Sequence, residues 1–308
     1  MESIQTTGGL YTNEIRNITM ENICRVFECT PEDIDELVPM QEGLSNIVLS
    51  FRYNGGRYIY RHPGLGTEAL VDRGRETIMQ AVVAEAGIDP TLVAMDVENG
   101  WRIARFVEHR TFDYYDLNDM VRAMMLFQRL HSVPPKVRWN FDLIKKAEEI
   151  KAQIPPEAYG HLDDWDEIHD RSYVLYELAK TDGIRSCYVH GDARDDNFLI
   201  NKDEIYLIDW EYAGYGDPGF DIGSYVCGGD HSVEDVDRLL FTYFRRTPTR
   251  KQKRHFYAYI ALTGFFYSHW VMMKEAKGQK VGILKTRWHD YAMLFGKLAL
   301  EMYDKEDE

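Results

Sequence analysis

Three polar side chains in one stretch of the sequence have the types and the spacing that phosphoryl transfer requires. Asp192 and Asn197 stand five residues apart in the run HGDARDDN at 190–197, and Asp209 follows twelve residues later. Phosphoryl transfer uses one carboxylate to take the proton of the acceptor hydroxyl, and an amide oxygen with a second carboxylate to hold magnesium on the nucleotide phosphates. Magnesium favours hard oxygen ligands and keeps several waters, so two protein ligands are sufficient. A single Asp or Asn in a loop is usually a turn residue, but this ordered combination points to a phosphotransferase.

The elements that position these side chains follow from local patterns. Asp209 comes directly after the apolar run at 205–208, so it is expected at the end of a strand, where scaffolds present catalytic groups. Asn54-Gly55-Gly56 predicts a hairpin turn between two strands. Thr67 is a candidate helix cap, and Gly87 is expected to end that helix after Ala86. The N-terminal part is therefore expected to hold helices at 13–29 and 67–86 and strands at 36–40, 46–53, 57–61, 92–95 and 101–107.

After about Glu108 the pattern becomes helical. Apolar residues recur at helical spacing from Met120 to Leu130. Further helices are expected near 141–153, 163–181, 233–245, 251–276 and 285–303, with short strands near 198–200 and 205–208. The chain is thus predicted to be α+β, with a small antiparallel-sheet lobe at 1–107 and a larger helical lobe at 108–308.

Composition narrows the class of protein. The 308 residues include 36 Lys and Arg against 51 Asp and Glu, a net charge of −15, and 44% are apolar. This apolar content supports a real core, and the acidic balance disfavours binding to nucleic acid. Such a balance would attract metal ions or a cationic substrate, although it more often serves solubility. The four cysteines match no zinc pattern and are expected as reduced thiols of a cytoplasmic protein. The start of the chain lacks the pattern of a signal peptide, and the apolar stretch at 257–273 is short for a membrane span.

The run at 190–197 and the run YLIDWEY at 206–212 resemble the choline/ethanolamine kinase and aminoglycoside phosphotransferase superfamily. The resemblance extends from about Glu36 to the last helices and implies a two-lobe, protein-kinase-like fold that uses ATP and Mg²⁺. It implies that Asp192 is the catalytic base and that Asn197 and Asp209 are the magnesium ligands. It also implies that His190 supports the loop and that Asp221 is structural.

The N-terminal part agrees with this resemblance. Gly43, Ser45 and Asn46 lie between two predicted strands, where backbone N–H groups can approach phosphates. The same residues would also suit a plain hairpin turn. The basic residue that contacts nucleotide phosphates in such kinases falls at Arg61, where protein kinases carry Lys, and Arg supplies a planar fork for phosphate oxygens. The stretch RHPGLGTEALVDRGRE at 61–76 resembles the bacterial choline kinase branch.

Two further parts of the nucleotide site are implied. Glu76 is the candidate partner that orients Arg61, although an exposed charge or a pair with Arg73 is the plainer interpretation. Phe106 and Val107 fall at the interlobe hinge, where the backbone would bind adenine.

Choline is a quaternary ammonium, which proteins hold with aromatic faces and nearby carboxylates. Tyr212, Tyr267 and Trp270 match the aromatic positions of choline kinases, although an aromatic stripe at helical spacing is more often core. Glu211 and Asp217 are possible carboxylates of the same pocket, or structural residues. Human-type choline kinases carry Glu near the position of Gly228, so the pocket wall is expected to differ.

The leading hypothesis is an ATP-dependent choline kinase. Ethanolamine or another small amino alcohol stays open as the acceptor, and an aminoglycoside is the runner-up. A binding module without activity is the non-enzymatic alternative, and the intact Asp192, Asn197 and Asp209 argue against it.

Overall fold

The chain folds into two compact units. The computed structural model describes residues 4–6, 9–40, 46–63, 72–137, 139–156, 164–202, 204–278, 282 and 284–305. Unit 1 comprises residues 1–110 with 199–212, and unit 2 comprises 111–198 with 213–308. The chain first passes from unit 1 to unit 2 after Arg110, close to the predicted boundary at 107/108, but residues 199–212 belong to unit 1 again. Backbone hydrogen bonds hold them there, from Arg110 to Ile200 (3.0 Å) and from Leu207 to Ile88 (3.4 Å).

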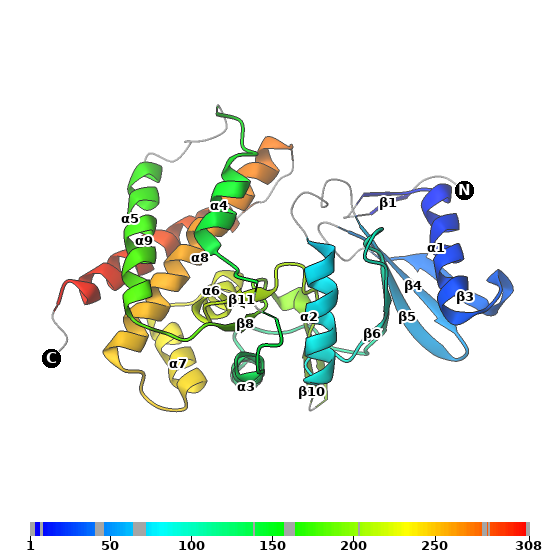
Figure 1. Ribbon diagram of the computed structural model, residues 1–308, viewed down its shortest axis with the longest axis horizontal. Coiled ribbons are helices and arrows are strands. Elements are labelled where there is room, and N and C mark those ends of the chain that lie inside the picture. Colours follow the sequence, from blue (N-terminus) through cyan, green and yellow to red (C-terminus); the bar gives the residue numbers. More distant parts are fainter. Residues whose placement is uncertain are drawn as a thin grey trace. The chain divides into compact units, whose positions relative to one another are not determined.

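Unit 1 is built on a five-stranded antiparallel sheet with the order β3-β4-β5-β7-β6 (Figure 1). The strands are β3 (Ile34–Pro39), β4 (Ile47–Tyr53), β5 (Gly56–His62), β6 (Leu92–Met95) and β7 (Arg102–Arg105). These confirm the five predicted strands, with ends shifted by a few residues. The predicted hairpin turn is also confirmed, because Asn54 and Gly55 both have positive φ (47° and 77°) between β4 and β5.

Two helices accompany this sheet. Helix α1 (Asn13–Phe27) begins at Thr12, whose side chain accepts a hydrogen bond from the backbone N–H of Ile15, and it buries Ile23 in the core of the sheet. Helix α2 (Arg73–Glu85) is capped by Asp72, so the prediction that Thr67 caps it is wrong; residue 67 itself lies outside the described residues. Gly87, at φ 66°, follows the end of α2 as predicted. The chain also forms two unpredicted three-residue strands, β1 (Ile4–Thr6) and β2 (Gly9–Tyr11).

Unit 2 is mainly helical. Its helices are α3 (Leu117–Ser132), α4 (Leu143–Lys151), α5 (Trp165–Thr181), α6 (Gly219–Gly228), α7 (Val233–Phe244), α8 (Arg250–Ala276) and α9 (Leu284–Tyr303). All but α6 were predicted. Two short strands, β8 (Cys187–Val189) and β11 (Gly214–Gly216), pair antiparallel and were not predicted. The predicted strands near 198–200 and 205–208 form the hairpin of β9 (Phe198–Asn201) and β10 (Glu204–Leu207).

Helix α6 packs unusually closely against α8. A side chain at Gly223 would place its Cβ 2.2 Å from Thr263 Oγ1 and 2.9 Å from the carbonyl oxygen of Tyr259. Glycine is therefore required for this approach. The approach holds two polar residues of α6, Asp221 and Ser224, in the interior, where both are fully buried.

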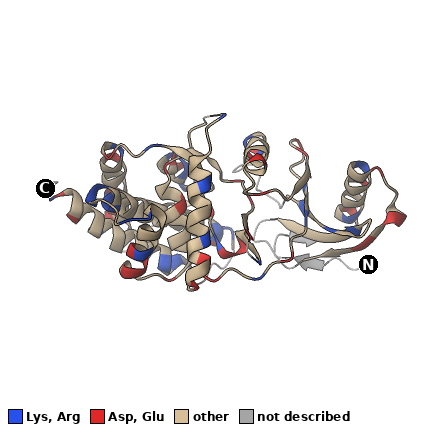
Figure 2. Ribbon diagram, turned by 90° about the horizontal axis from the view of Figure 1, so that it is seen from below, with Lys and Arg blue, Asp and Glu red and all other residues tan. Residues whose placement is uncertain are grey.

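Charged residues are interspersed along the helices of unit 2 (Figure 2). Two basic residues at the start of α8 pair with the protein's own carboxylates, Lys253 with Asp237 (2.7 Å) and Arg254 with Asp182 (2.9 Å). None of the helices in the described ranges is both long enough and apolar enough to cross a membrane.

Candidate active site

Arg61 is the centre of a buried ionic cluster in unit 1. Its side chain projects from β5, is 4% exposed, and donates hydrogen bonds to Glu76 of α2 and to Asp209, which follows β10. A buried guanidinium is tolerated only when it is paired in this way. The predicted pairing of Glu76 with Arg61 is thus present, and Glu76 also accepts a hydrogen bond from Arg73 (2.7 Å).

A further arginine completes this cluster. Arg102 of β7 lies directly opposite Arg61 in the antiparallel register, so both side chains share one face of the sheet. Arg102 lies 3.6 Å from Glu76 and 3.5 Å from Asp209. Glu211 lies 3.7 Å from Arg61 and 3.9 Å from Arg73. Three guanidiniums therefore face three carboxylates, and a polyphosphate would meet planar, permanently charged donors here.

The pKa values of the cluster reflect competition between burial and charge. Burial alone would lower the pKa of Arg61, but Asp209 and Glu76 outweigh it and raise that pKa. Burial disfavours the ionised form of Glu76, yet Arg61 and Arg102 hold its pKa below the usual value. For Glu211 burial dominates and, with the negative charge of Asp209, raises the pKa to about 8.

Trp210 anchors the loop that presents Asp209 and Glu211. Its indole is fully buried, and Nε1 donates to the carboxylate of Asp89 (3.2 Å) and to the carbonyl of Leu207 (3.1 Å). Asp209 has a left-handed backbone, with φ 69°. Asp accepts this conformation more readily than most residues. The side chains of Asp209 and Glu211 therefore come from positions directly before and after the fixed Trp210.

The predicted catalytic loop in unit 2 is fixed by Asp221. The carboxylate of Asp221 accepts hydrogen bonds from the backbone N–H of His190 (2.9 Å) and of Gly191 (2.7 Å). The amide nitrogen of Asn197 donates to the carbonyl oxygen of Asp192 (2.8 Å) and to its Oδ2 (3.1 Å). His190 is fully buried and its Nδ1 accepts a hydrogen bond from the Asp192 N–H (3.1 Å). These contacts agree with supporting roles for His190 and Asp221.

The hydrogen bonds of Asn197 show which of its atoms could bind Mg²⁺. Asn197 uses its nitrogen toward Asp192, so its amide oxygen is the atom left to bind a cation. Amide and carboxylate oxygens are the ligands that Mg²⁺ prefers. The predicted ligands Asn197 and Asp209 therefore each carry a donor atom of the kind that the ion takes.

The rest of the predicted nucleotide site is only partly described. Gly43 and Ser45 lie outside the described residues, and Asn46 is buried next to β4. The N–H of Phe106 donates to the carbonyl of Arg57 (2.9 Å), so this N–H is not available to adenine. The Arg57 guanidinium covers one face of the Phe106 ring at 3.8 Å. The carbonyl of Val107 accepts a hydrogen bond from His109 (2.7 Å).

Two of the predicted acceptor-binding aromatics lie in one cluster of unit 2. Tyr267 is buried and Trp270 is half-buried, both on α8. Trp288 of α9 joins them, with ring centroids 4.8 Å from Tyr267 and 6.3 Å from Trp270. The Lys274 ammonium lies 5.0 Å from the centroid of the Trp270 ring, so a cation already reaches this ring. Tyr212, the third predicted aromatic, belongs to unit 1.

Asp217 and Gly228 have structural surroundings. The carboxylate of Asp217 accepts hydrogen bonds from Nε2 of buried His255 (2.9 Å) and from the N–H of Gly219 at the start of α6 (2.8 Å). None of these contacts favours the prediction that Asp217 binds the acceptor. At Gly228 a Cβ would lie 2.0 Å from the hydroxyl of Tyr114, so a Glu cannot replace it without moving that side chain.

We expect the His255 interaction to make stability depend on pH. Burial opposes the charged imidazole, but Asp182 and Asp217 outweigh it and raise the pKa of His255 to about 9. Because the unfolded value is about 6.5, this stabilisation is complete below about pH 6.5 and is lost as the pH rises through 9. Thermal unfolding should show a larger melting-temperature deficit of His255→Gln at pH 6 than at pH 9.5. An equal deficit at both pH values would contradict this assignment.

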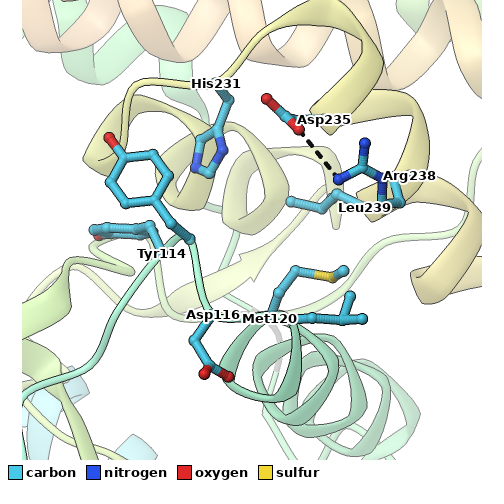
Figure 3. A pocket seen from close by; sticks show the side chains of 9 residues that line it. Tyr114, Asp116, Met120, His231, Asp235, Arg238 and Leu239 are labelled. Carbon is cyan, nitrogen blue, oxygen red and sulfur yellow. Dashed lines mark ion pairs between the residues drawn. The ribbon is translucent and has the colours of Figure 1, made fainter.

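A separate pocket of about 120 Å³ opens between the starts of α3 and α7 (Figure 3). Its lining includes Tyr114, Asp116, Met120, His231, Asp235 and Arg238, and none of the residues predicted from the sequence. Nε2 of His231 is buried there without a hydrogen-bond partner. The hydroxyl of Tyr114 donates to the carbonyl of Ala193 in the predicted catalytic loop (3.2 Å), so one wall of this pocket supports that loop.

Sequence reasoning missed Arg102, Trp288 and Ser224. Arg102 could have been paired with Arg61 only from the strand order, in which β7 is the neighbour of β5. Trp288 stands on a different helix from Tyr267 and Trp270, so helical spacing carries no signal for it. Ser224 lies within the unpredicted helix α6.

Known proteins share both the sequence pattern and the fold. Residues 36–255 match the phosphotransferase enzyme family. Protein LicA from Haemophilus influenzae is 24% identical over 263 residues, which cover 82% of this chain and 75% of that protein.

Solved structures of similar fold include choline kinase LicA from Streptococcus pneumoniae, with a TM-score of 0.76, 19% identity, and coverage of 93% of this chain and all of that one. A structure of LicA in complex with AMP gives a TM-score of 0.77 and 19% identity, and covers 94% of this chain and 100% of that one. The predicted two-lobe, protein-kinase-like α+β fold is confirmed.

Proposed function

The chain belongs to the phosphotransferase enzyme family, and from that premise we propose that it transfers the γ-phosphoryl group of ATP to the hydroxyl of choline. The observation that carries the choice of acceptor is the aromatic cluster of Tyr267, Trp270 and Trp288. A quaternary ammonium has no N–H to donate, so aromatic faces recognise it better than carboxylates alone. The likeness to choline kinase LicA supports the same acceptor. We place the enzyme in the cytoplasm, because all four of its cysteines are free thiols.

The proposed reaction divides the work between a phosphate side and an acceptor side. Arg61, oriented by Glu76, binds phosphate oxygens of ATP. Asn197 and Asp209 would hold Mg²⁺, which would neutralise negative charge on the phosphates. The choline oxygen forms a bond to the γ-phosphorus while the bond from that phosphorus to the β–γ bridging oxygen breaks, and ADP leaves.

Asp192 receives the proton of the choline hydroxyl. Its carboxylate is oriented by Asn197, which donates to its Oδ2 (3.1 Å). Because the transition state of phosphoryl transfer is loose, placing the hydroxyl correctly matters more than basicity.

An ADP-release assay with choline, ethanolamine, an aminoglycoside and a sugar tests the acceptor directly. Choline is expected to give the highest kcat/KM. A preference for ethanolamine would reject the aromatic recognition of methyl groups, and a preference for the aminoglycoside would reject a small cationic acceptor altogether. If none of the four compounds supports release of ADP, this acceptor class is rejected.

Trp270 separates recognition of choline from ordinary packing. A ring that contacts a desolvated cation contributes about 0.5–2 kcal/mol, so Trp270→Leu should weaken choline binding by about tenfold, since 1.4 kcal/mol corresponds to tenfold. Trp270→Phe should keep part of the affinity, because a smaller aromatic face remains. ATP affinity should be unchanged in both variants, as measured by calorimetry.

The matched control is Trp139→Leu, the same change at another half-buried tryptophan of unit 2. It should affect stability without selective loss of choline. If Trp270→Leu binds choline with wild-type affinity, the Trp270 ring is not part of the acceptor site.

A further inference from the structure

Two buried hydroxyl groups connect the peptide groups on either side of Asp192. The N–H of Ala193 lies 2.6 Å from Oγ of Ser224, this Oγ lies 2.7 Å from the hydroxyl of Tyr267, and that hydroxyl lies 3.0 Å from the carbonyl oxygen of Gly191. The Gly191 carbonyl and the Ala193 N–H belong to the two peptide groups that flank the α-carbon of Asp192. Both ends of the chain of hydrogen bonds are therefore anchored beside the catalytic base.

The direction of every hydrogen bond in this chain follows from its two ends. A carbonyl can only accept, so Tyr267 must donate its single proton to Gly191. A backbone N–H can only donate, so Ser224 accepts from Ala193 and gives its own proton to Tyr267. Burial and the charge of Asp192 raise the pKa of Tyr267 well above its usual value near 10, so the hydroxyl stays protonated.

Hydrogen bonds also hold the backbone groups that lie just outside these two peptide groups, the N–H of Gly191 and the carbonyl of Ala193. The N–H of Gly191 donates to Asp221 (2.7 Å), and the carbonyl of Ala193 accepts from Tyr114 (3.2 Å). Gly191 has φ 80°, a conformation that favours glycine. The hydroxyl chain is thus the part of this support that spans Asp192 itself.

We propose that Ser224 and Tyr267 are positioning residues for Asp192, and that their hydroxyl chain fixes the backbone from which the base reaches the acceptor. The inference rests on the proposed function, in which Asp192 is the base. It also gives Tyr267 two roles on one side chain. Its ring lies in the aromatic cluster next to Trp288, while its hydroxyl holds the catalytic loop. The acceptor-binding surface and the base are therefore linked through a single rigid ring.

Tyr267→Phe keeps the ring and removes the hydroxyl. We expect kcat to fall by about tenfold or more, because a small displacement of a catalytic group costs this much, with KM for ATP and for choline within about twofold of wild type. Ser224→Ala should have the same effect, and the double variant should be no slower than the slower single variant. Either substitution breaks the same series of hydrogen bonds, so the losses of kcat in the two single variants should not add up in the double variant.

Tyr291→Phe is the matched control, since it removes another buried hydroxyl of unit 2, one that accepts a hydrogen bond from the N–H of His231 (2.6 Å). It should lower the melting temperature by a similar amount without lowering kcat. Equal kcat losses in Tyr291→Phe and Tyr267→Phe, or losses of Tyr267→Phe and Ser224→Ala that multiply, would overturn the inference. If Tyr267→Phe does not fold, Ser224→Ala serves as the test alone. A wild-type kcat in Ser224→Ala would then overturn the inference.

The Asp192→Ala background distinguishes this inference from the function on which it rests. Single-turnover rates in that background should not fall further when Tyr267→Phe is added, because the hydroxyl acts through the missing carboxylate. If Asp192→Ala itself keeps wild-type turnover, the proposed base is wrong. If Asp192→Ala is inactive while Tyr267→Phe and Ser224→Ala keep full kcat, only the positioning role is wrong.

Discussion

Asp192→Ala is expected to lower kcat by about 10²–10⁴-fold, the range that general-base catalysis contributes, and to leave ATP affinity within about twofold. The reason is that the proposed contact of Asp192 is with the acceptor hydroxyl, whereas the proposed phosphate-binding group is the guanidinium cluster around Arg61. Steady-state kinetics with choline, together with calorimetry of ATP binding, measure the two effects separately.

The control for this variant comes from the same loop. Asp196 is about half exposed, and its ion pair is with Arg194, its neighbour in the loop (3.0 Å). Asp196→Ala should therefore keep most of kcat. Turnover of Asp192→Ala that equals that of Asp196→Ala would exclude Asp192 as the base.

Asp209→Asn is expected to remove the dependence of nucleotide binding on magnesium and to abolish turnover. Asn is a better choice than Ala, because residue 209 has φ 69°, which Asn adopts with little strain. The amide keeps an oxygen that can accept from Arg61, so the shape of the ionic cluster is preserved. The substitution removes the negative charge that a Mg²⁺ ligand at this position would supply.

Magnesium titrations of ATP binding check this expectation. In the wild type, added chelator should weaken ATP binding and stop turnover, and Asp209→Asn without chelator should resemble the chelated wild type. Asn197→Ala should be less severe and should raise the magnesium concentration needed for half-maximal rate. Turnover that is indifferent to chelator would reject both residues as ligands.

The fold was largely predictable because its main elements carry local signals. Strands β4 and β5 flank an Asn-Gly turn, and amphipathic helices such as α3 and α7 bury one face each. Helix α6 carries no such signal. Nine of its residues, from Gly219 to Cys227, are buried, so polar and apolar positions do not alternate at helical spacing. Strands β8 and β11 have three residues each, too few to show a period.

The candidate site was predictable where chemistry and sequence position coincide. Asp192, Asn197 and Asp209 stand in short motifs, and the contact of Glu76 with Arg61 agrees with the pairing that the sequence predicts. Arg102 depends on strand order, which is a non-local property. The sequence carries less information for Asp217, because a carboxylate near the predicted metal-binding motif has the same pattern whether it binds a substrate or has a structural role. Its observed partners are His255 and the N–H of Gly219.

The close approach of α6 to α8 has a consequence for natural variation in this enzyme. Gly223 has no functional atom, yet any side chain there would strike Thr263 and the backbone carbonyl of Tyr259, and would displace the helix that carries Asp221 and Ser224. Inactivating alleles are therefore expected at Gly223, although no step of the proposed reaction uses this residue. A second substitution should not easily restore activity to such alleles. Shortening Thr263 would relieve the collision with its side chain, but the collision with the carbonyl oxygen of Tyr259 would remain, because no substitution removes a main-chain atom.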